Sequence, residues 1–202
     1  MSESFWGRSP QTSLVDRIPL FPLDVVLFPG EMFGLHIFEE RYVMMAEEVL
    51  AEDLPIGIVL ARQDQPDELI EFEPEGIGTA AKVIQAEQVE DRYMLQTVGV
   101  RRFRIIEVLS DKPYQEALVE WLDEEPGNED TAQQLITEVL ESVEAIGGTV
   151  DRDSDALDDP ITVSHAVAAA LPVDLETKQR LLEASDAATR LEAELDVLRA
   201  VA

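Results

Sequence analysis

The sequence predicts an α+β chain, in which a β pseudo-barrel with one early helix is followed by a lobe of four helices. Two patterns predict this fold class. Residues 16–122 hold about six short apolar runs at close spacing, separated by turn residues, which is typical of a closed or nearly closed barrel. From about residue 130 onward, apolar residues instead recur at helical spacing in four short segments, as in a small bundle.

The barrel is expected to open with an apolar stretch that contains two prolines. Pro19 and Pro22 lack the N–H group that a β-ladder needs, so the first strand, at 18–21, is expected at a sheet edge or broken at the prolines. The run at 25–28 is apolar throughout. It predicts a second strand that is covered on both faces.

The next segment predicts a turn, a strand and the early helix. Pro29-Gly30 favours a type II turn, because proline presets one φ angle and glycine accepts a positive one. Residues 32–37 form a further apolar run, and from Glu39 to Glu52 the apolar residues follow helical spacing. The rest of the barrel is expected to contain an acidic loop or irregular hairpin at 62–75 and strands at 56–61, 76–85, 93–98, 101–108 and 114–121. The glycines of the strand at 76–85 suggest a bulge or a close approach of another main chain.

The helical lobe is predicted from caps as much as from periodicity. Asp130 is expected to cap the first helix, which ends at Gly147-Gly148. An aspartate followed by proline is a strong start signal, because proline is tolerated at the first helical position. The other three helices are expected to start at Asp159-Pro160, at Asp174, and at Ser185 or Asp186.

These patterns divide the chain into four parts. Residues 1–14 show no periodicity and predict a flexible tail. The barrel lobe is expected at 15–122 and the helical bundle at 131–202. Between them, residues 123–130 are charged, contain Pro126-Gly127 and predict a linker.

Four segments carry motifs that occur together in one family: IPLFPLDVVLFPG (18–30) continued by LHIFEERY (35–42), GIGTAAKV (76–83), VGVRRFRI (98–105), and Leu171-Pro172 with Leu181-Leu182-Glu183. In this order they resemble the N-terminal substrate-binding domain of Lon proteases, and most closely the small stand-alone proteins made of that domain. The resemblance covers residues 16–200. It implies a PUA-like pseudo-barrel and a domain that helps recognise unfolded or degron-bearing proteins.

Composition predicts a soluble, cytoplasmic protein. No apolar run reaches the roughly 18 residues of a membrane helix, and the N-terminus lacks the layout of a secretory signal. The 43 acidic and 15 basic residues give a net charge of −28, which repels nucleic acid and anionic membranes. An acidic, lysine-poor surface of this kind is expected either in a salt-adapted organism or in one whose genome favours arginine. The absence of cysteine excludes disulfides and thiolate chemistry.

No reactive centre can be assembled from these motifs. None of the ten glycines begins a phosphate loop, and the resemblance leaves no residue range for the ATPase and serine–lysine protease modules of Lon. Ser164 and His165 are neighbours in a predicted helix and face different directions, so we expect a half-exposed histidine rather than a catalytic base. His36 and Glu39 are too few for a metal site. We therefore expect no catalytic residue, cofactor or metal.

Two groups of charged residues carry family motifs and are expected to be structural. Arg101, Arg102 and Arg104 form the one basic cluster, and PUA-like barrels often bind RNA. Because the chain has a net charge of −28, these few arginines are instead expected to pair with carboxylates and to pack their aliphatic stems on apolar surface. Tyr42 is expected in the core, with Arg41 bonded to backbone or acidic groups around the turn.

The expected function is the non-enzymatic binding of proteins or peptides, as a substrate-recognition module or an adaptor in protein quality control. Partners would lie in a groove between the lobes or add a strand to an open sheet edge. The candidate binding residues are Met32 and Phe33 beyond the Pro-Gly turn and Trp121 at the barrel–bundle junction, each of which would otherwise pack in the core. An RNA-binding PUA-like protein and a small-ligand binder are the alternatives, and self-association is open.

Overall fold

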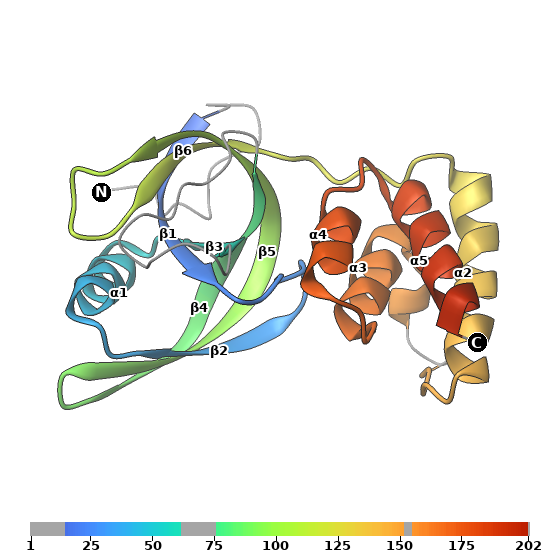
Figure 1. Cartoon of the computed structure of the whole chain (residues 1–202), viewed down its shortest axis with the longest axis horizontal. Helices are drawn as coiled ribbons and strands as arrows, with labels where there is room; N and C mark the ends of the chain where they lie inside the picture. Colours follow the sequence, from blue (N-terminus) through green and yellow to red (C-terminus); the bar gives the residue numbers. More distant parts are fainter. Residues whose placement is uncertain (1–14, 62–75, 152–154, 202) are drawn as a thin grey trace. The chain divides into compact units, whose positions relative to one another are not determined.

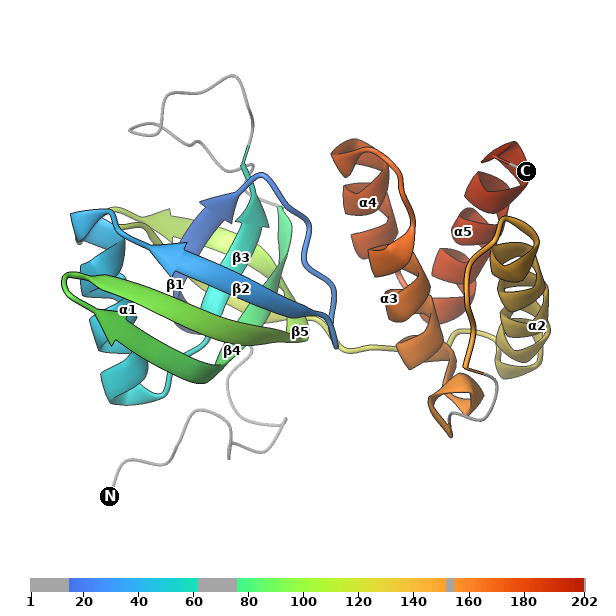
Figure 2. The ribbon, with the colours of Figure 1, turned by 90° about the horizontal axis from the view of Figure 1, so that it is seen from below.

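The structure, a computed structural model, describes residues 15–61, 76–151 and 155–201. The chain divides into two compact units, residues 1–122 and 123–202, of which the first holds the strands and one helix and the second holds the other helices (Figures 1 and 2). The tail expected at 1–14 and the loop expected at 62–75 lie outside the described residues. No helix in the described part of the chain is long and apolar enough to cross a membrane.

Six strands of the first unit form a mixed sheet that curls into a nearly closed ring, as predicted (Figure 1). The strand order is β2-β5-β4-β3-β1-β6, and a further pairing of β5 with β6 joins the ring. β1 and β3 are parallel, and the other pairs are antiparallel. The elements are β1 (Val15–Leu23), β2 (Met32–Ile37), α1 (Glu40–Glu52), β3 (Ile56–Leu60), β4 (Ile77–Val89), β5 (Arg92–Leu109) and β6 (Glu116–Trp121).

The helix α1 packs its apolar face on one of two core clusters in the ring. Tyr42 and Met45 of α1 join buried residues of β1, β2, β3 and β5 in this cluster. The expected roles at the helix start are confirmed: Tyr42 is buried against Phe21, with ring centroids 4.4 Å apart, and Arg41 pairs with Glu39 at 2.8 Å. The second cluster surrounds Phe103 between β1, β3, β4, β5 and β6.

The first strand neither lies at a sheet edge nor is broken at its prolines, so both expectations are wrong. β1 lies between β3 and β6. Its partner changes along its length, however: Val15 to Pro19 pair with β6, and Leu20 to Leu23 pair with β3. Since each half has only one paired side, neither Pro19 nor Pro22 has to interrupt a ladder.

The apolar run at 25–28 is largely buried but is not a strand, contrary to the prediction. Side chains bond two of its main-chain groups. The Thr79 hydroxyl donates to the Leu27 carbonyl at 2.6 Å, and the Phe28 N–H donates to Oε2 of Glu31 at 3.0 Å. An apolar run indicates that a segment is buried, but not that it is a strand. This segment is a loop that packs on the ring.

The turn predicted at Pro29-Gly30 is confirmed. Gly30 has φ +83°, and the Glu31 N–H donates to the Phe28 carbonyl at 3.1 Å. Two further bonds attach this turn to β5: the Gly30 N–H donates to the Gly99 carbonyl at 2.8 Å, and the Gly99 N–H donates to the Glu31 carbonyl at 2.9 Å. The turn therefore sets where β2 begins against β5.

The long hairpin of β4 and β5 exceeds its predicted length. β4 runs on to Val89, and its register with β5 shifts at Ala80/Ala81 and Val83/Gln85 rather than at its glycines. The close main-chain approach expected at the glycines is found at Gly78, where an added Cβ would lie 2.5 Å from the carbonyl oxygen of Ile58. The two strands expected at 93–98 and 101–108 are one continuous strand, β5. Its first part pairs with β2 and its last part pairs with β6, which is how one strand links both sides of the ring (Figure 1).

In its described residues the second unit contains four α-helices, as predicted, and a short 3₁₀ helix. Asp159, Asp174 and Asp186 each accept a main-chain N–H of the following helix. The N-cap of the first helix is Asn128 rather than the predicted Asp130. Asp130 lies in the first turn, where the helix dipole stabilises a carboxylate. The elements are α2 (Glu129–Ala145), η2 (Asp155–Asp158), α3 (Pro160–Ala170), α4 (Leu175–Leu182) and α5 (Ala187–Val201).

Residues 124–127, which we call the strap, bond to the helical unit. The carbonyl of Glu125 accepts the Ala187 N–H at 2.9 Å, and that of Pro126 accepts the Ala188 N–H at 3.2 Å. Ala187 and Ala188 are the first residues of α5, whose initial N–H groups have no partner inside the helix. The strap therefore caps α5, within the segment that the sequence predicts as a linker.

A buried polar cluster around Arg190 joins three helices of this unit to the strap. The Arg190 side chain of α5 has no exposed surface. Its Nε donates to the Leu181 carbonyl of α4 and its Nη1 to Oγ of Ser164 of α3, each at 2.9 Å. Its Nη2 lies 3.7 Å from Oε2 of Glu124 in the strap.

His165 belongs to the same cluster, and the expectation of a half-exposed histidine is wrong. His165 is 2% exposed, and its Nε2 lies 3.2 Å from Oε2 of Glu124. The reason is that α3 is apolar around most of its circumference and is covered on more than one face. Glu194 is buried nearby, where burial raises the pKa of its carboxyl well above the ordinary range and the Arg190 charge opposes that rise.

A charged network ties α1 to the β5–β6 connection and to β1. Nζ of Lys112 lies 2.5 Å from Oε1 of Glu48 and 3.2 Å from Oε1 of Glu116, and the Tyr114 hydroxyl donates to Oε2 of Glu48 at 2.5 Å. Arg17 also pairs with Glu116. The hydrogen bonds from Lys112 and Tyr114 lower the pKa of Glu48, while burial and the Glu48 carboxylate raise the pKa of Tyr114 to about 12.

The low pKa of Glu48 predicts a loss of stability in acid. A carboxyl whose pKa is lower in the folded than in the unfolded chain stabilises the fold above the unfolded pKa, and this contribution is lost as the pH falls through the folded pKa. Glu48→Gln is therefore expected to reduce stability at neutral pH and to flatten its decline below about pH 4.5. Urea unfolding across this range checks the result, with the exposed neighbour Glu47→Gln as control. Parallel pH profiles for wild type and Glu48→Gln would contradict it.

Candidate functional site

The edge strand β2 presents one row of side chains to solvent and another to the core. Met32, Gly34 and His36 are exposed, whereas Leu35 and Ile37 are buried. Among the described residues β2 pairs with β5 only, and it stands at one end of the strand order. The outer face of β2, β5 and β4 therefore meets solvent beside an open edge.

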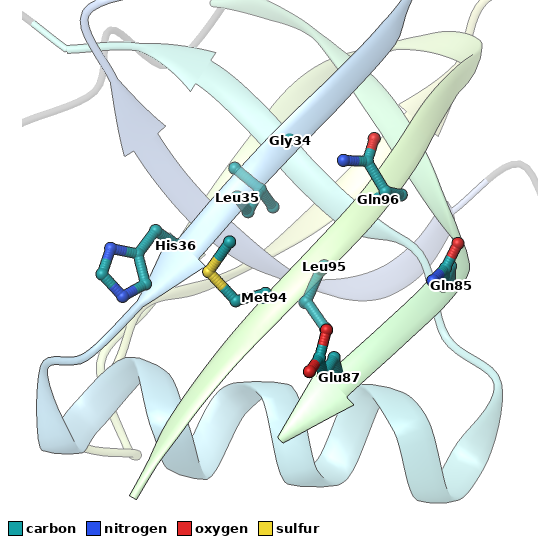
Figure 3. A pocket seen from close by; sticks show the side chains of 8 residues that line it. All are labelled: Gly34, Leu35, His36, Gln85, Glu87, Met94, Leu95 and Gln96. Carbon is teal, nitrogen blue, oxygen red and sulfur yellow. The ribbon is translucent and has the colours of Figure 1, made fainter. Parts of the chain in front are cut away.

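A depression of about 280 Å³ lies on this outer face (Figure 3). Gly34 opens it, because glycine has no side chain and the nearest atom to an added Cβ would be Nε2 of Gln96, at 3.5 Å. Figure 3 shows the Met94 side chain between the ribbons of β2 and β5, with His36 beyond the other side of β2. The lining residues are Gly34, Leu35, His36, Gln85, Glu87, Met94, Leu95 and Gln96.

Large apolar side chains are exposed on and beside this face, and together with the depression we call them the outer patch. Met32 is 62% exposed, Phe38 61% and Met94 52%. The Phe38 ring lies 5.6 Å from the ring of His36. Exposed apolar side chains that gather on one face mark interaction sites more often than scattered ones do.

The outer patch carries little charge for so acidic a chain. Glu87 is the one carboxylate among the residues that line the depression, whereas the whole chain has 43 acidic residues. In the described part of the chain, no group of three or more His, Cys, Asp or Glu side chains is placed to hold a metal ion. Glu39, considered with His36 as a metal pair, bonds to Arg41 instead.

The structure separates the three residues expected to bind partners. Met32 lies on the outer patch. Phe33 points to the opposite side of β2, is half-buried and packs against the core cluster of α1. Trp121 ends β6 and is half-buried: its Nε1 donates to Oδ2 of Asp16 at 2.7 Å, and its ring packs edge-on against Phe103 at 6.2 Å. Phe33 and Trp121 therefore have packing roles, and neither lies with Met32 on one surface.

The basic cluster of β5 is largely engaged within the barrel. Nη1 of Arg104 donates to Oε2 of Glu120 at 2.8 Å, which confirms the expected carboxylate partner. Nε of Arg101 donates to the Leu122 carbonyl at 3.2 Å, and its guanidinium lies 5.6 Å from the Trp121 ring centroid. Arg102 is buried. The three arginines thus do not form the exposed basic row that RNA backbones require.

Comparison with known proteins identifies the family of this chain. Residues 17–200 match the family described as the ATP-dependent protease La (LON) substrate-binding domain. The chain belongs to this Lon domain family. Lon protease 2 of Myxococcus xanthus is 25% identical over 191 residues, covering 90% of this chain and 23% of that protein. Lon protease of Escherichia coli K12 is 27% identical over 193 residues, covering 91% and 25%. This Lon domain thus spans about a quarter of the length of these relatives.

Solved structures share the fold of this Lon domain. A Lon N-terminal domain protein from Xanthomonas campestris has a TM-score of 0.63 at 24% identity, covering 88% of this chain and 95% of that one. The N-terminal domain of the Mycobacterium avium complex Lon protease has a TM-score of 0.68 at 16% identity, covering 91% and 98%. The fold that the sequence resemblance implies is therefore confirmed.

Sequence reasoning missed most of the outer patch of the Lon domain. Met94 and Gln85 lie in stretches that the sequence marks as strands, but the sequence does not say which face of each strand is covered. The alternation in 92–98 held a usable signal: Tyr93 and Leu95 point inward, and Met94 with Gln96 must then point outward. An apolar residue in the outward row of such a strand is the feature to look for.

Proposed function

We propose that this Lon substrate-binding domain homologue binds unfolded or degron-bearing protein segments through its outer patch and carries out no catalysis itself. The observation that carries the proposal is the group of exposed Met32, Phe38 and Met94 on and beside a depression, in a chain with a net charge of −28. An unfolded segment differs from a folded protein chiefly in its accessible apolar side chains, and a patch of this kind recognises that difference.

The chemistry of the patch suits clients of many sequences. Two of its apolar side chains are methionines, which are unbranched and polarizable and adapt to differently shaped partners. Burying one such side chain fully contributes about 1.5–3 kcal/mol. A few contacts of this size give binding that is reversible, as a recognition step before delivery to another protein requires.

A role as an adaptor in protein quality control follows from the same binding step. In that role the domain holds a client while a separate protease cuts it. The purified chain alone is then expected to bind a client without producing new peptide ends or releasing phosphate from ATP. Client cleavage or nucleotide hydrolysis that disappears on a single side-chain replacement in this chain would contradict the non-enzymatic part of the proposal.

Replacement of the exposed methionines is the direct test of the patch. Met32→Ser with Met94→Ser is expected to weaken binding to a permanently unfolded client, such as reduced and carboxymethylated lactalbumin, by about tenfold or more, since each loses part of a methionine burial. The matched control is Ile146→Ser, which removes an exposed apolar residue of the helical unit. Fluorescence anisotropy of the labelled client measures both. Equal affinities for wild type and the double variant would refute the assignment to this face.

A further inference from the structure

The main-chain groups on the outer edge of β2 can be assigned from the ladder that β2 forms with β5. The Gly99 N–H donates to the Glu31 carbonyl at 2.9 Å, and antiparallel strands bond at every second residue from such a point. Phe33, directly opposite Thr97, is the next bonded position. The N–H and C=O groups of Met32, Gly34 and His36 therefore point away from β5, toward the open edge.

This edge lacks the features that protect exposed strands. Edge strands usually carry a proline, a lysine or a bulge that hinders pairing with another chain. β2 reads Met-Phe-Gly-Leu-His-Ile, and its register with β5 runs from Met32 to Ile37 without a shift. At its centre Gly34 leaves the main chain uncovered. The edge is thus regular, accessible and six residues long.

Charge selects the kind of chain that can approach this edge. A second copy carries the same net charge of −28, and nucleic acid is also anionic, so both are repelled. A segment with basic residues is attracted. Glu40 follows β2, and Glu87 lies across β5 at the level of His36, so both exposed carboxylates stand at the end of the edge that leads into α1. The remaining, apolar part of the outer patch suits uncharged side chains.

We propose that β2 receives an extended client segment as an added strand, with apolar residues at alternate positions and lysine or arginine at its ends. This inference rests on the function proposed above and adds to it the mode of binding and the class of segment. The added strand bonds to the main chain of Met32, Gly34 and His36. Every second side chain of the strand then lies on the outer face beside Met32 and the depression, because side chains alternate across a strand.

Replacement of Gly34 separates main-chain from side-chain recognition. Gly34→Pro removes the N–H that points to the open edge, and the bonded positions on the β5 side remain, since proline is tolerated at an edge position whose N–H faces solvent. With the peptide KKVTVTVTKK as probe, its affinity is expected to fall by about tenfold, as for a lost hydrogen bond and a blocked edge. Gly34→Ala keeps the N–H and has room for its methyl group, so it is expected to lose less affinity than Gly34→Pro does.

Methylated probes test the same point on the unchanged protein. Methylating the peptide nitrogens at the valines, or instead at the threonines, blocks one edge of the peptide strand while keeping every side chain. Only one of the two isomers is expected to lose affinity. A probe with glutamate in place of the four terminal lysines is expected to bind several-fold more weakly at low salt, and this difference should shrink as salt is added.

The outcomes distinguish this inference from the proposed function. If Met32→Ser with Met94→Ser weakens binding while Gly34→Pro and both methylated isomers bind like their controls, the patch binds clients and strand addition is wrong. If the lysine and glutamate probes bind equally, the assignment of basic ends is wrong. If wild type binds neither the unfolded client nor the peptides, the proposed function itself fails.

Discussion

Arg190→Met is expected to lower the free energy of unfolding of the helical unit by about 3–5 kcal/mol. Arg190 is fully buried and makes hydrogen bonds to Leu181 and Ser164, so its guanidinium joins α3, α4 and α5. Methionine has a similar length and no donors. The change therefore removes a donor from each of these acceptors and takes the buried cation away from the half-buried Glu124 and the buried Glu194 carboxyl. Removing one partner of a buried charge cluster costs far more than removing an exposed pair.

Hydrogen exchange on the full chain measures this loss in the helical unit alone. Peptides from α3, α4 and α5 should exchange faster in Arg190→Met, while peptides from the ring should not change. Arg199→Met is the matched control, because Arg199 is on the same helix and pairs with Glu138 at 3.1 Å in an exposed position. That pair is expected to contribute less than about 1 kcal/mol. Similar losses of stability in the two variants would show that the buried Arg190 contributes no more to stability than the exposed Arg199 does.

Gly99→Ala is expected to destabilise the ring by about 1–3 kcal/mol and to displace the turn before β2. A Cβ at this position would lie 2.3 Å from the carbonyl oxygen of Phe28 and 3.2 Å from Cγ2 of Thr79. The first of these atoms is main chain and cannot rotate away. The added methyl group must therefore push the Pro29-Gly30 turn from β5, against the two hydrogen bonds that hold it there.

Thermal unfolding and client binding together check this prediction. Because the turn sets where β2 begins, Gly99→Ala should lower the melting temperature and also weaken binding at the outer patch. Gly34→Ala serves as control, since a methyl group there meets only Nε2 of Gln96, at 3.5 Å, and should cost little. Unchanged stability in Gly99→Ala would mean that the loop at 25–31 moves without cost.

The sequence predicts the order and type of most elements because local signals agree with the fold. Pro29-Gly30, Asp159-Pro160 and Asp174 act within a few residues, and the structure confirms each of them. Signals that depend on distant neighbours are less reliable. The run at 25–28 is apolar because the ring covers it, and the two halves of β1 tolerate proline because β6 and β3 each cover one of them.

The candidate site is less predictable than the fold for the same reason. Met32 can be identified from the sequence because it follows a turn, but Phe33 and Trp121 are equally apolar and face inward. Gln85 of β4 and Met94 of β5, which lie on the same face as Met32, come more than 50 positions later in the chain. Likewise, nothing local marks Arg190 as buried, because its partners lie on α3, α4 and the strap.

The contacts of the strap determine where the chain can be divided into its two units without loss of stability in the helical unit. A helical fragment that starts at residue 128 would lack Glu125 and Pro126, which cap the first turn of α5, and Glu124, which faces His165 and Arg190. Such a fragment would be less stable than the same helices in the intact chain, and its behaviour would misrepresent them. Dissection between Leu122 and Asp123 keeps every one of these contacts inside a single piece.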